Sequence, residues 1–531
     1  MRASGAVAIA ALLMGASIGC SASEVPDGRG PGAPTSDTRS GAAEPTTSPA
    51  EALAPLRPLR VTDSGGRPRI ADDAGAEVLL RGASLTALTD YHQADPRFVP
   101  TKPPTDADWD QMAGRGFSVV RLVVSWSALE PTRGQIDLTY VEQIRDAIAA
   151  AAERRIHTVL AMHQDGWSRF LATPPFTACP TGTEPDIGGN GAPVWAALTD
   201  GLTAPDTCRP VGVGGTSPAV QAAFGAFYEN LNGIRDAFVA IWRVLAEIVA
   251  ADPAVAGFDL LDEPLLVHDP LRGRLLYSDL VRTVVDGIRA GERDGGGFEH
   301  IVFLQPLAGA PTAAALPVDG VPAGDHVALA PHLGIVAGGP ERSDADVLPE
   351  ADLARAAADR GWALWVGQVG PSGVDDQSLA RLRDLAIDQD DALVGAAHWR
   401  WRQWCGDPAS LGRLGQAPGP IQIQLNDTSC PDDVDAGPNV ELLAVAGRAY
   451  PRAAPGRLTA LRSDATTGAL RLAGAVDDDL SGGGDLVVWV PGDERPELTG
   501  QGIGDTRLVR AGRGWYAITE ITDSPYELEV E

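Results

Sequence analysis

Polar and charged residues follow the ends of several apolar stretches in the middle of this chain. His163, Gln164 and Asp165 end the stretch VLAMHQD, and Asp262 and Glu263 end the stretch GFDLLDE. One such residue is usually a satisfied structural group. Several at equivalent places indicate a site, because parallel strands bring their carboxyl ends to one edge. The other members of the set are Arg121 in VVRLVVSW, His332 in ALAPHLG, Gln368 in LWVGQVG, and Trp399 and Trp401 in AAHWRWRQW.

Carboxylates and tryptophans together indicate glycoside cleavage. That reaction needs a carboxylic acid to protonate the leaving oxygen, and Glu263 is well placed to be this acid/base. A retaining enzyme also needs a carboxylate nucleophile about 5–5.5 Å away. Trp399 or Trp401 would give a sugar ring an apolar face to stack on. No His, Cys, Asp or Glu spacing matches a metal site, so we expect neither a metal nor a cofactor.

The elements that position these residues alternate between apolar runs and amphipathic segments. Continuous apolar runs are typical of parallel strands buried on both faces. The expected strands are Val78–Leu85, Val119–Trp126, Thr158–His163, Val255–Leu261, Ile301–Gln305, His326–Pro331, Leu364–Val369 and Val394–Trp401. The expected helices are Val141–Arg154, Ala219–Ala250, Pro270–Ala290, Ala351–Asp359 and Gln377–Asp388.

This alternation predicts an α/β fold, a (β/α)8 TIM barrel over residues 57–449. A doubly wound open sheet is the alternative, and it is disfavoured because no Gly-rich phosphate loop follows the first strand. From about Tyr450, short strand-like segments such as GDLVVWVPGD alternate with turns. Residues 450–531 are therefore expected to form a C-terminal antiparallel β-sandwich.

The N-terminus indicates export. Residues 1–20 contain a short apolar run and end in Ser-Ile-Gly-Cys, which resembles a bacterial lipobox with Cys20 as the lipidated residue. Residues 21–56 are rich in Ser, Pro, Gly and Ala and read as a disordered tether. We expect an exported lipoprotein held at the cell envelope or surface by a lipid anchor. Simple secretion is the alternative.

Charge and cysteine content further limit the class of protein to which the chain can belong. The 42 basic and 71 acidic residues give a formal charge of −29, which excludes a nucleic-acid partner. Besides Cys20, four cysteines remain, and they fit two loop disulfides, Cys179–Cys208 and Cys405–Cys430. Four cysteines allow three pairings, so the sequence leaves the connectivity open.

Several stretches in order resemble glycoside hydrolase family 5, and within it the endoglycoceramidases. They include GFSVVRLVVSWSALEPTRG, HTVLAMHQDGWS, AFVAIWRVLAEIVAADPAVAGFDLLDEP and YPRAAPGRLTALRSDATTGALRL, between about Leu80 and Leu472. The resemblance implies a barrel with a C-terminal β-sandwich that cuts between an oligosaccharide and ceramide. It implies that Glu263 is the acid/base. It also implies that Arg121, His163, His332 and Trp399 occupy site positions, and we add Asp165 as a substrate-binding candidate.

The chain departs from that pattern where the chemistry is most demanding. The family's Asn-Glu-Pro is here Asp262-Glu263-Pro264, and its nucleophilic Glu is here Gln368. The Tyr of its His-x-Tyr is missing after His332. An amide is a poor nucleophile, so a covalent glycosyl-enzyme is not expected. Since the amide and the carboxylate have exchanged places, we expect Gln368 to donate a hydrogen bond to Asp262.

Three functions follow from these departures. The first is a surface-tethered binder of glycans or glycolipids in which retaining hydrolysis is weak or lost. The second is an active glycosidase in which Asp262 or Asp165 serves as the second carboxylate; inverting chemistry tolerates a spacing of roughly 6.5–9.5 Å. The third is a structural envelope protein that uses the barrel as a scaffold. The tryptophans of the eighth strand argue against the third.

Overall fold

The computed structural model describes most of the chain beyond the N-terminal fifty residues. The described residues are 51, 53–63, 66–93, 95–211, 216–267, 269–308, 316–317, 326–333, 350–370, 375–408, 419–420, 424–476 and 484–531. The expected signal peptide, Cys20 and most of the tether lie outside them. In the described part of the chain, no helix is both long and apolar enough to cross a membrane.

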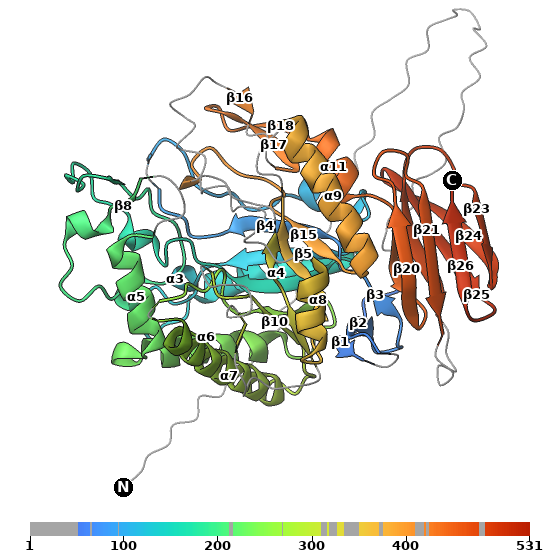
Figure 1. Cartoon of the computed structure of the whole chain (residues 1–531). Helices are drawn as coiled ribbons and strands as arrows, with labels where there is room; N and C mark the ends of the chain where they lie inside the picture. Colours follow the sequence, from blue (N-terminus) through green and yellow to red (C-terminus); the bar gives the residue numbers. More distant parts are fainter. Residues whose placement is uncertain are drawn as a thin grey trace, which may run out of the picture. The chain divides into compact units, whose positions relative to one another are not determined.

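Parallel strands form the centre of the fold (Figure 1). Every pairing in this sheet is parallel. The strands are β4 (Gly82–Leu88), β5 (Val119–Val124), β6 (His157–Met162), β9 (Val255–Asp259), β10 (Ile301–Leu304), β11 (Val327–Leu329), β12 (His332–Leu333), β13 (Ala363–Leu364), β14 (Val366–Val369) and β15 (Ala396–His398).

The sheet closes through the seventh strand of the barrel. That strand is interrupted at Trp365 into β13, which pairs with β11, and β14, which pairs with β15 and β12. β15 in turn pairs with β4, so the order returns to its start. All eight strands expected from the sequence therefore have a counterpart in the barrel, each with one or both ends shifted; the first begins at Gly82, so Val78 lies outside it.

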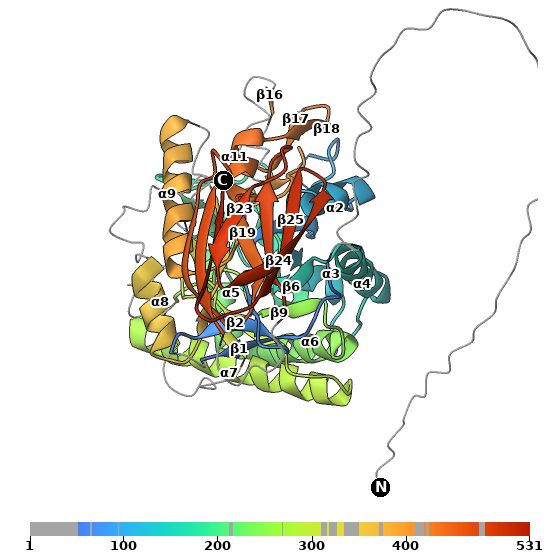
Figure 2. The ribbon, with the colours of Figure 1, turned by 90° about the vertical axis from the view of Figure 1, so that its right-hand side faces the viewer.

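Helices surround this barrel, as the end-on view in Figure 2 shows. Capping side chains lie at several of their N-termini; Asp137, for example, accepts hydrogen bonds from the N–H groups of Thr139 and Tyr140 at the start of α4. The helices are α2 (Asp106–Ala113), α3 (Trp126–Leu129), α4 (Leu138–Glu153), α5 (Pro218–Tyr228), α6 (Ile234–Val249), α7 (Pro270–Asp294), α8 (Glu350–Ala358), α9 (Asp376–Ala392) and α11 (Val440–Ala446).

The single helix expected over 219–250 is in fact two. Asn230, Asn232 and Gly233 all have positive φ, a conformation that asparagine and glycine tolerate best. The side chain of Asn230 then accepts hydrogen bonds from the N–H groups of Arg235 and Asp236, which caps α6. The apolar periodicity continues through the break, which is why the pattern alone predicted one helix.

Short elements shape the loops at the carboxyl ends of the strands. Disulfides join Cys179 to Cys208 and Cys405 to Cys430. The first holds the long loop after β6, and the second a small sheet after β15. These loops contain η1 (Arg169–Leu171), η2 (Val194–Ala196), η3 (Ala204–Thr207), η4 (Leu231–Gly233), β7 (Thr183–Glu184), β8 (Arg209–Pro210), β16 (Gly419–Pro420), β17 (Asn426–Cys430) and β18 (Val434–Pro438).

The C-terminal strands form two antiparallel sheets, and the first also takes in three strands from the start of the described chain. Its order is β1-β2-β3-β19-β22-β25-β24, and that of the second is β20-β21-β26-β23. The strands are β1 (Leu59–Thr62), β2 (Arg69–Asp72), β3 (Glu77–Val78), β19 (Tyr450–Ala454), β20 (Arg457–Ser463), β21 (Leu470–Ala475), β22 (Leu486–Pro491), β23 (Leu498–Gln501), β24 (Ile503–Ala511), β25 (Gly514–Ile521) and β26 (Tyr526–Val530).

The start of the described chain does not lie wholly in the barrel. The expected barrel segment 57–449 includes β3, and β3 pairs with β19 of the C-terminal sheet. Leu59, Val61 and Ile70 meanwhile pack with inward-facing barrel residues such as Val119 and Ile301. β1 and β2 thus belong to one sheet and cover the amino-terminal end of the barrel. That leaves the opposite, carboxyl end for the polar residues.

Candidate active site

Asp262 lies just past the end of β9, and Arg121 from the middle of β5 holds it in place. Arg121 Nη2 is 2.5 Å from Asp262 Oδ1 and 2.7 Å from Asp259 Oδ2. Gln305, after β10, donates its amide to both oxygens of Asp259 at 3.0 Å and to Asp262 Oδ1 at 3.3 Å. All four side chains are buried. Asp262 is therefore a fixed group of the barrel wall.

The surroundings of Asp262 keep its carboxyl ionised. Burial opposes ionisation, but His163, Arg121 and His332 outweigh it and hold the pKa of Asp262 well below its usual range. Arg121 responds in the opposite sense: burial works against its charge, and the Asp259 and Asp262 carboxylates still raise its pKa. One cation and two carboxylates are thus held together out of water.

Glu263 differs from its neighbour, because its side chain is 53% exposed. Its backbone has a φ of 36°, a left-handed conformation that is uncommon for a residue with a side chain. Gln305 Oε1 accepts the N–H of Glu263 at 2.8 Å. Gln164 Nε2 donates to the carbonyls of Asp262 and Glu263 at 3.0 and 3.3 Å. Two glutamines therefore hold the turn that presents the Glu263 carboxylate to solvent.

His332 lies between the two carboxylates. Its Nδ1 is 3.0 Å from Glu263 Oε1, and its Nε2 is 3.8 Å from Asp262 Oδ1. The Nε2 atom is buried and has no hydrogen-bond partner. One imidazole ring thus separates the exposed carboxylate of Glu263 from the buried carboxylate of Asp262.

His163 and Trp399 form a flat pair on the other side of Asp262. His163 Nε2 is 3.3 Å from Asp262 Oδ2, and its Nδ1 contacts the Asn190 amide. Burial lowers the pKa of His163, although Asp262 opposes the shift. The rings of His163 and Trp399 are stacked, with centroids 5.4 Å apart and planes at 6°. Trp399 is half-buried, and the Arg400 guanidinium carbon lies 4.8 Å from the centre of its ring.

Trp401 cannot serve as the sugar platform that the sequence also allowed. Its side chain is completely buried, and its indole N–H donates to Asp108 Oδ1 at 2.9 Å. The ring packs edge-on against Phe117. Trp399 is therefore the tryptophan available to a ligand.

Gln368 lies in β14, in register with His332 of β12. Only 7% of its surface is exposed, and its Oε1 atom has no hydrogen-bond partner. The hydrogen bond expected from Gln368 to Asp262 is not formed, so that expectation was wrong. Gln305 supplies the amide donor to Asp262 instead.

Asp165 stands apart from the buried network. Its side chain reaches solvent, and its backbone pairs with Asn190. Protein atoms still crowd the carboxyl group, and this partial loss of water, with the charges of Asp186 and Glu263, raises the pKa of Asp165 to about 7. A group with such a pKa can accept or donate a proton near neutrality.

Two carboxylates and one imidazole of this site are also side chains of the kind that can bind a cation. Atoms of Asp259, Asp262 and His332 lie within 4.8 Å of one another. The Arg121 guanidinium and the Gln305 amide already occupy the carboxylate oxygens. A metal ion would have to displace a buried cation, so this donor set does not favour one.

The sequence did not predict Asp259, Gln305 and Asn190, which orient Arg121, Asp262 and His163. A charged Asp259 inside an otherwise apolar strand, and a Gln305 directly after one, were the signals available. Asn190 lies in a long loop without any pattern that points to His163.

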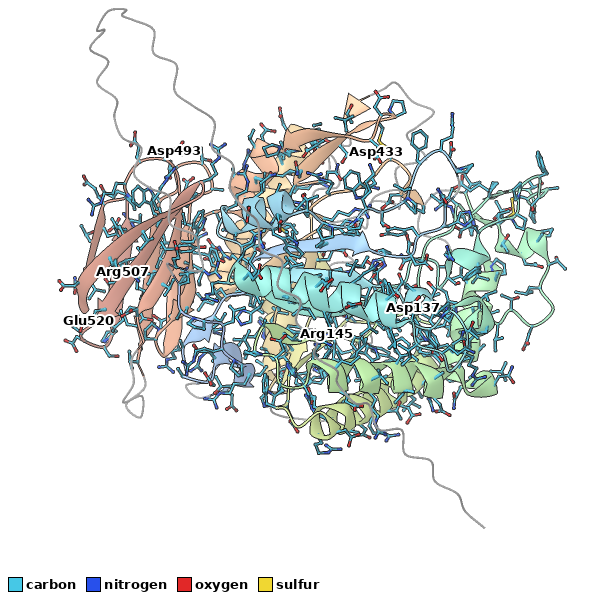
Figure 3. All side chains as sticks on the ribbon, turned by 180° about the vertical axis from the view of Figure 1, so that it is seen from behind. Asp137, Arg145, Asp433, Asp493, Arg507 and Glu520 are labelled. Atoms are coloured by element: carbon cyan, nitrogen blue, oxygen red, sulfur yellow. A yellow bond between two sulfur atoms is a disulfide. The ribbon has the colours of Figure 1, made fainter. Side chains whose placement is uncertain are left out.

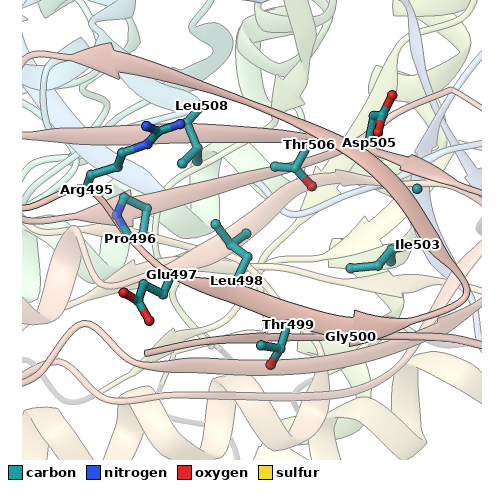
Figure 4. A pocket seen from close by; sticks show the side chains of 11 residues that line it. Arg495, Pro496, Glu497, Leu498, Thr499, Gly500, Ile503, Asp505, Thr506 and Leu508 are labelled. Carbon is teal, nitrogen blue, oxygen red and sulfur yellow. The ribbon is translucent and has the colours of Figure 1, made fainter.

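Two hollows of the surface lie away from these residues. One, of about 640 Å³, opens between β23 and β24, where Leu498, Ile503 and Leu508 are accompanied by polar groups (Figure 4). Another, of about 580 Å³, lies between α4 and α6; Figure 3 shows α4 with Asp137 at its start and Arg145 further along. Neither is lined by the strand-end residues described above.

Comparison with known proteins agrees with this architecture. A family model described as cellulase (glycosyl hydrolase family 5) matches residues 71–376. Endoglycoceramidase I of Rhodococcus hoagii (strain 103S) is 30% identical over 212 residues, which cover 40% of this chain and 38% of that protein. Endoglycoceramidase of Cyanea nozakii is 27% identical over 216 residues, 38% of this chain and 42% of that one. The matched region thus spans about two fifths of these relatives' length.

Solved structures match over more of the chain. A crystal structure of endogalactoceramidase has 36% sequence identity and a TM-score of 0.79, and the match covers 90% of this chain and 99% of that one. Endo-glycoceramidase II from Rhodococcus sp. has 21% identity and a TM-score of 0.64 with the same coverage, which supports the fold alone.

Proposed function

The chain belongs to glycosyl hydrolase family 5, and from that premise we propose that it binds glycans or glycolipids with its covalent route of retaining hydrolysis weak or lost. The observation that carries this proposal is Gln368. The family resemblance places a nucleophilic Glu at this position, and here a neutral amide occupies it. An amide cannot form the glycosyl ester on which retaining hydrolysis depends.

Asp262 is poorly suited to take over as the nucleophile. Its carboxylate is ionised, but only 5% of the side chain is exposed. Arg121 and Gln305 occupy Oδ1, and His163 lies against Oδ2. Attack on a sugar carbon would require Asp262 to leave these contacts and leave Arg121 partly unpaired. Its position supports the role of a fixed anion.

The ligand class follows from the relatives and from the partly exposed ring of Trp399. Similar proteins bear the names endogalactoceramidase and endoglycoceramidase, and these names support a glycolipid as ligand. Trp399, stacked on His163, offers the apolar surface that a sugar ring requires. We assign Arg121, His163, Asp165, His332 and Trp399 to binding the sugar or positioning the groups that do so, and Glu263 to the acid/base position.

The protein's place in the cell is part of the same proposal. A lipid on Cys20 would hold the barrel at the envelope, where glycolipid headgroups are presented. Replacing the cysteine, Cys20→Ser, should move the protein from the membrane fraction to the soluble fraction. An unchanged distribution would argue against the anchor and leave secretion as the alternative.

Hydrolysis of a fluorescent glycosphingolipid tests the proposal. The proteins compared are wild type, Gln368→Glu, the double variant with Asp262→Asn, and the control Gln135→Glu, which places the same change at an exposed glutamine. We expect the double variant to exceed wild type by about 10³-fold or more, because it regains the nucleophile. Calorimetric titration of wild type with the free oligosaccharide measures binding separately. Comparable cleavage by wild type, or absence of both binding and regained cleavage, would refute the proposal.

A second candidate is an active inverting glycosidase with Glu263 as acid and Asp165 as base. The pKa of about 7 at Asp165 favours it, since a base poised near neutrality can activate water. This enzyme would lose its activity in Asp165→Asn and release a product of inverted anomeric configuration, measured by proton NMR during turnover. A retained configuration would exclude it.

A further inference from the structure

We propose that the site hydrolyses glycosides whose cleaved sugar carries a 2-acetamido group, with the acetamido oxygen as the nucleophile. The inference rests on the proposed function, because it concerns the same sugar site. Glycosides of this class do not need a nucleophile from the enzyme, because the substrate supplies its own. The two substitutions that disable the usual route, at Asp262 and Gln368, are the ones this chemistry favours.

The first support is the arrangement of the two adjacent carboxylates. Glu263 is exposed and shares a hydrogen bond with His332, so it can exchange a proton with a ligand. Asp262 is fixed, ionised and directly next to it in the chain. Substrate-assisted hydrolysis needs these two functions, a mobile proton for the leaving oxygen and a stationary anion for the acetamido group.

Asp262 retains an acceptor position for such a group. Oδ1 is taken by Arg121 and Gln305, whereas the described contacts of Oδ2 are limited to His163 Nε2 at 3.3 Å. A carboxylate oxygen accepts about two hydrogen bonds, so Oδ2 can also accept the acetamido N–H. The N–H becomes part of a cation during the reaction, and its bond to an anion then strengthens. A neutral Asn at this place would offer no such gain.

The first step can be written without an enzyme nucleophile. The acetamido oxygen attacks C1 as the bond from C1 to the leaving oxygen breaks. The carboxylic acid of Glu263 gives its proton to that oxygen, and the sugar becomes a cyclic oxazolinium. Asp262 accepts the hydrogen bond of its N–H. In the second step Glu263 takes a proton from water, the water oxygen bonds to C1, and the ring reopens with the C1 configuration retained.

A neutral residue at position 368 suits this pathway. In a retaining enzyme the nucleophile approaches the sugar from the face opposite the leaving group, and the acetamido oxygen must use the same face. A carboxylate there would repel that electron-rich oxygen. Gln368 is buried, uncharged and has an unpartnered Oε1, so it leaves the face free of negative charge. The half-buried Trp399 can cover the apolar side of the ring and the acetamido methyl group.

The first test uses wild-type protein alone, so it does not depend on the folding of a variant. It compares aryl β-glycosides of N-acetylglucosamine and N-acetylgalactosamine with those of glucose and galactose. The acetamido substrates are also made with one, two and three fluorines on the acetyl group. We expect turnover of the acetamido substrates only, and a rate that falls with each fluorine, because fluorine weakens the carbonyl oxygen as a nucleophile. The first product should be the β-anomer.

Variants then test the roles of Asp262 and Gln368. Asp262→Asn should lower the rate on the acetamido substrate by about 100-fold or more, as is typical when a charge that stabilises the transition state is removed. Asp286→Asn, the same change at an exposed aspartate on α7, should have no effect. Gln368→Glu should slow the acetamido substrate.

The outcomes separate this inference from the proposed function. Binding of both sugar classes without turnover of either overturns the acetamido pathway and leaves the binding proposal standing. Turnover that is indifferent to fluorination also overturns it. Cleavage of plain galactosides by wild type would refute the proposed function itself.

Discussion

Replacing Arg121 with methionine should destabilise the fold at pH 7 and much less at pH 5. Arg121 is completely buried and contacts two carboxylates at 2.5 and 2.7 Å. At an effective dielectric constant of about 20, each contact corresponds to roughly 6 kcal/mol of Coulomb attraction. Its own desolvation offsets much of this, and removing one partner of a buried pair typically costs about 3–5 kcal/mol.

Protonation sets an upper limit, which depends on pH, on the cost of leaving each carboxylate without its cation. A carboxylate left without its cation can take up a proton at a cost of about 1.4 kcal/mol for each pH unit above a pKa of about 3.9. That limit is roughly 4 kcal/mol per carboxylate at pH 7 and roughly 1.5 kcal/mol at pH 5. In the wild type, the folded pKa of Asp262 lies below the unfolded one, so this contribution is present above about pH 4 and is lost only as pH falls further.

Urea unfolding followed by tryptophan fluorescence at the two pH values measures the effect. The difference in free energy of unfolding between wild type and Arg121→Met should be at least about 3 kcal/mol at pH 7 and shrink by about 2 kcal/mol or more at pH 5. Arg282→Met is the control, because its ion pairs on α7 are exposed and worth at most about 1 kcal/mol. A small loss at pH 7, or an equal loss at both values, would refute the reasoning.

Three further outcomes are expected. Burial lowers the pKa of His398 to about 3, so the free energy of unfolding of the wild type should fall by up to about 1.4 kcal/mol per unit as the pH falls from 6.5 towards 3. His398→Leu should lose less stability over this range, and equal pH slopes for the two proteins would contradict the reasoning. Removing the Cys405–Cys430 disulfide, which spans 25 residues, by replacing both cysteines with serine should reduce the free energy of unfolding by about 3 kcal/mol, whereas an unchanged urea midpoint would argue against this. Trp399→Ala should weaken oligosaccharide binding in calorimetry by about tenfold or more, and unchanged affinity would remove Trp399 from the site.

The sequence predicted the barrel well because its strands are buried on both faces. The run VVRLVV that begins at Val119 is apolar at every position except Arg121, and this local signal can be recognised without knowing which strands pair with it. Strand ends were less visible; the seventh strand is divided at Trp365, whose side chain packs among the inward-facing residues. No local pattern could show that β1–β3, so far away in sequence, would join the C-terminal sheet.

The residues of the site, too, were only partly predictable from the sequence. Asp262 and Glu263 stood out because charges at the end of an apolar strand are costly without a purpose. Their partner Gln305 did not stand out, and neither did Asn190, the partner of His163, since neither has a fixed spacing in sequence from the residue it contacts. The expected bond from Gln368 to Asp262 was wrong for this reason, because sequence could not show that the Gln305 amide already occupies that oxygen.

The most direct test of the central claim is covalent trapping. A 2-deoxy-2-fluoro glycoside with a good leaving group leaves its sugar on any retaining carboxylate nucleophile, and intact-protein mass spectrometry detects the gain of one sugar. Wild type should remain unmodified, and the variant that combines Gln368→Glu with Asp262→Asn should gain one sugar on the introduced carboxylate. A wild-type protein that acquires one sugar on Asp262, Asp165 or any other carboxylate would contradict the account.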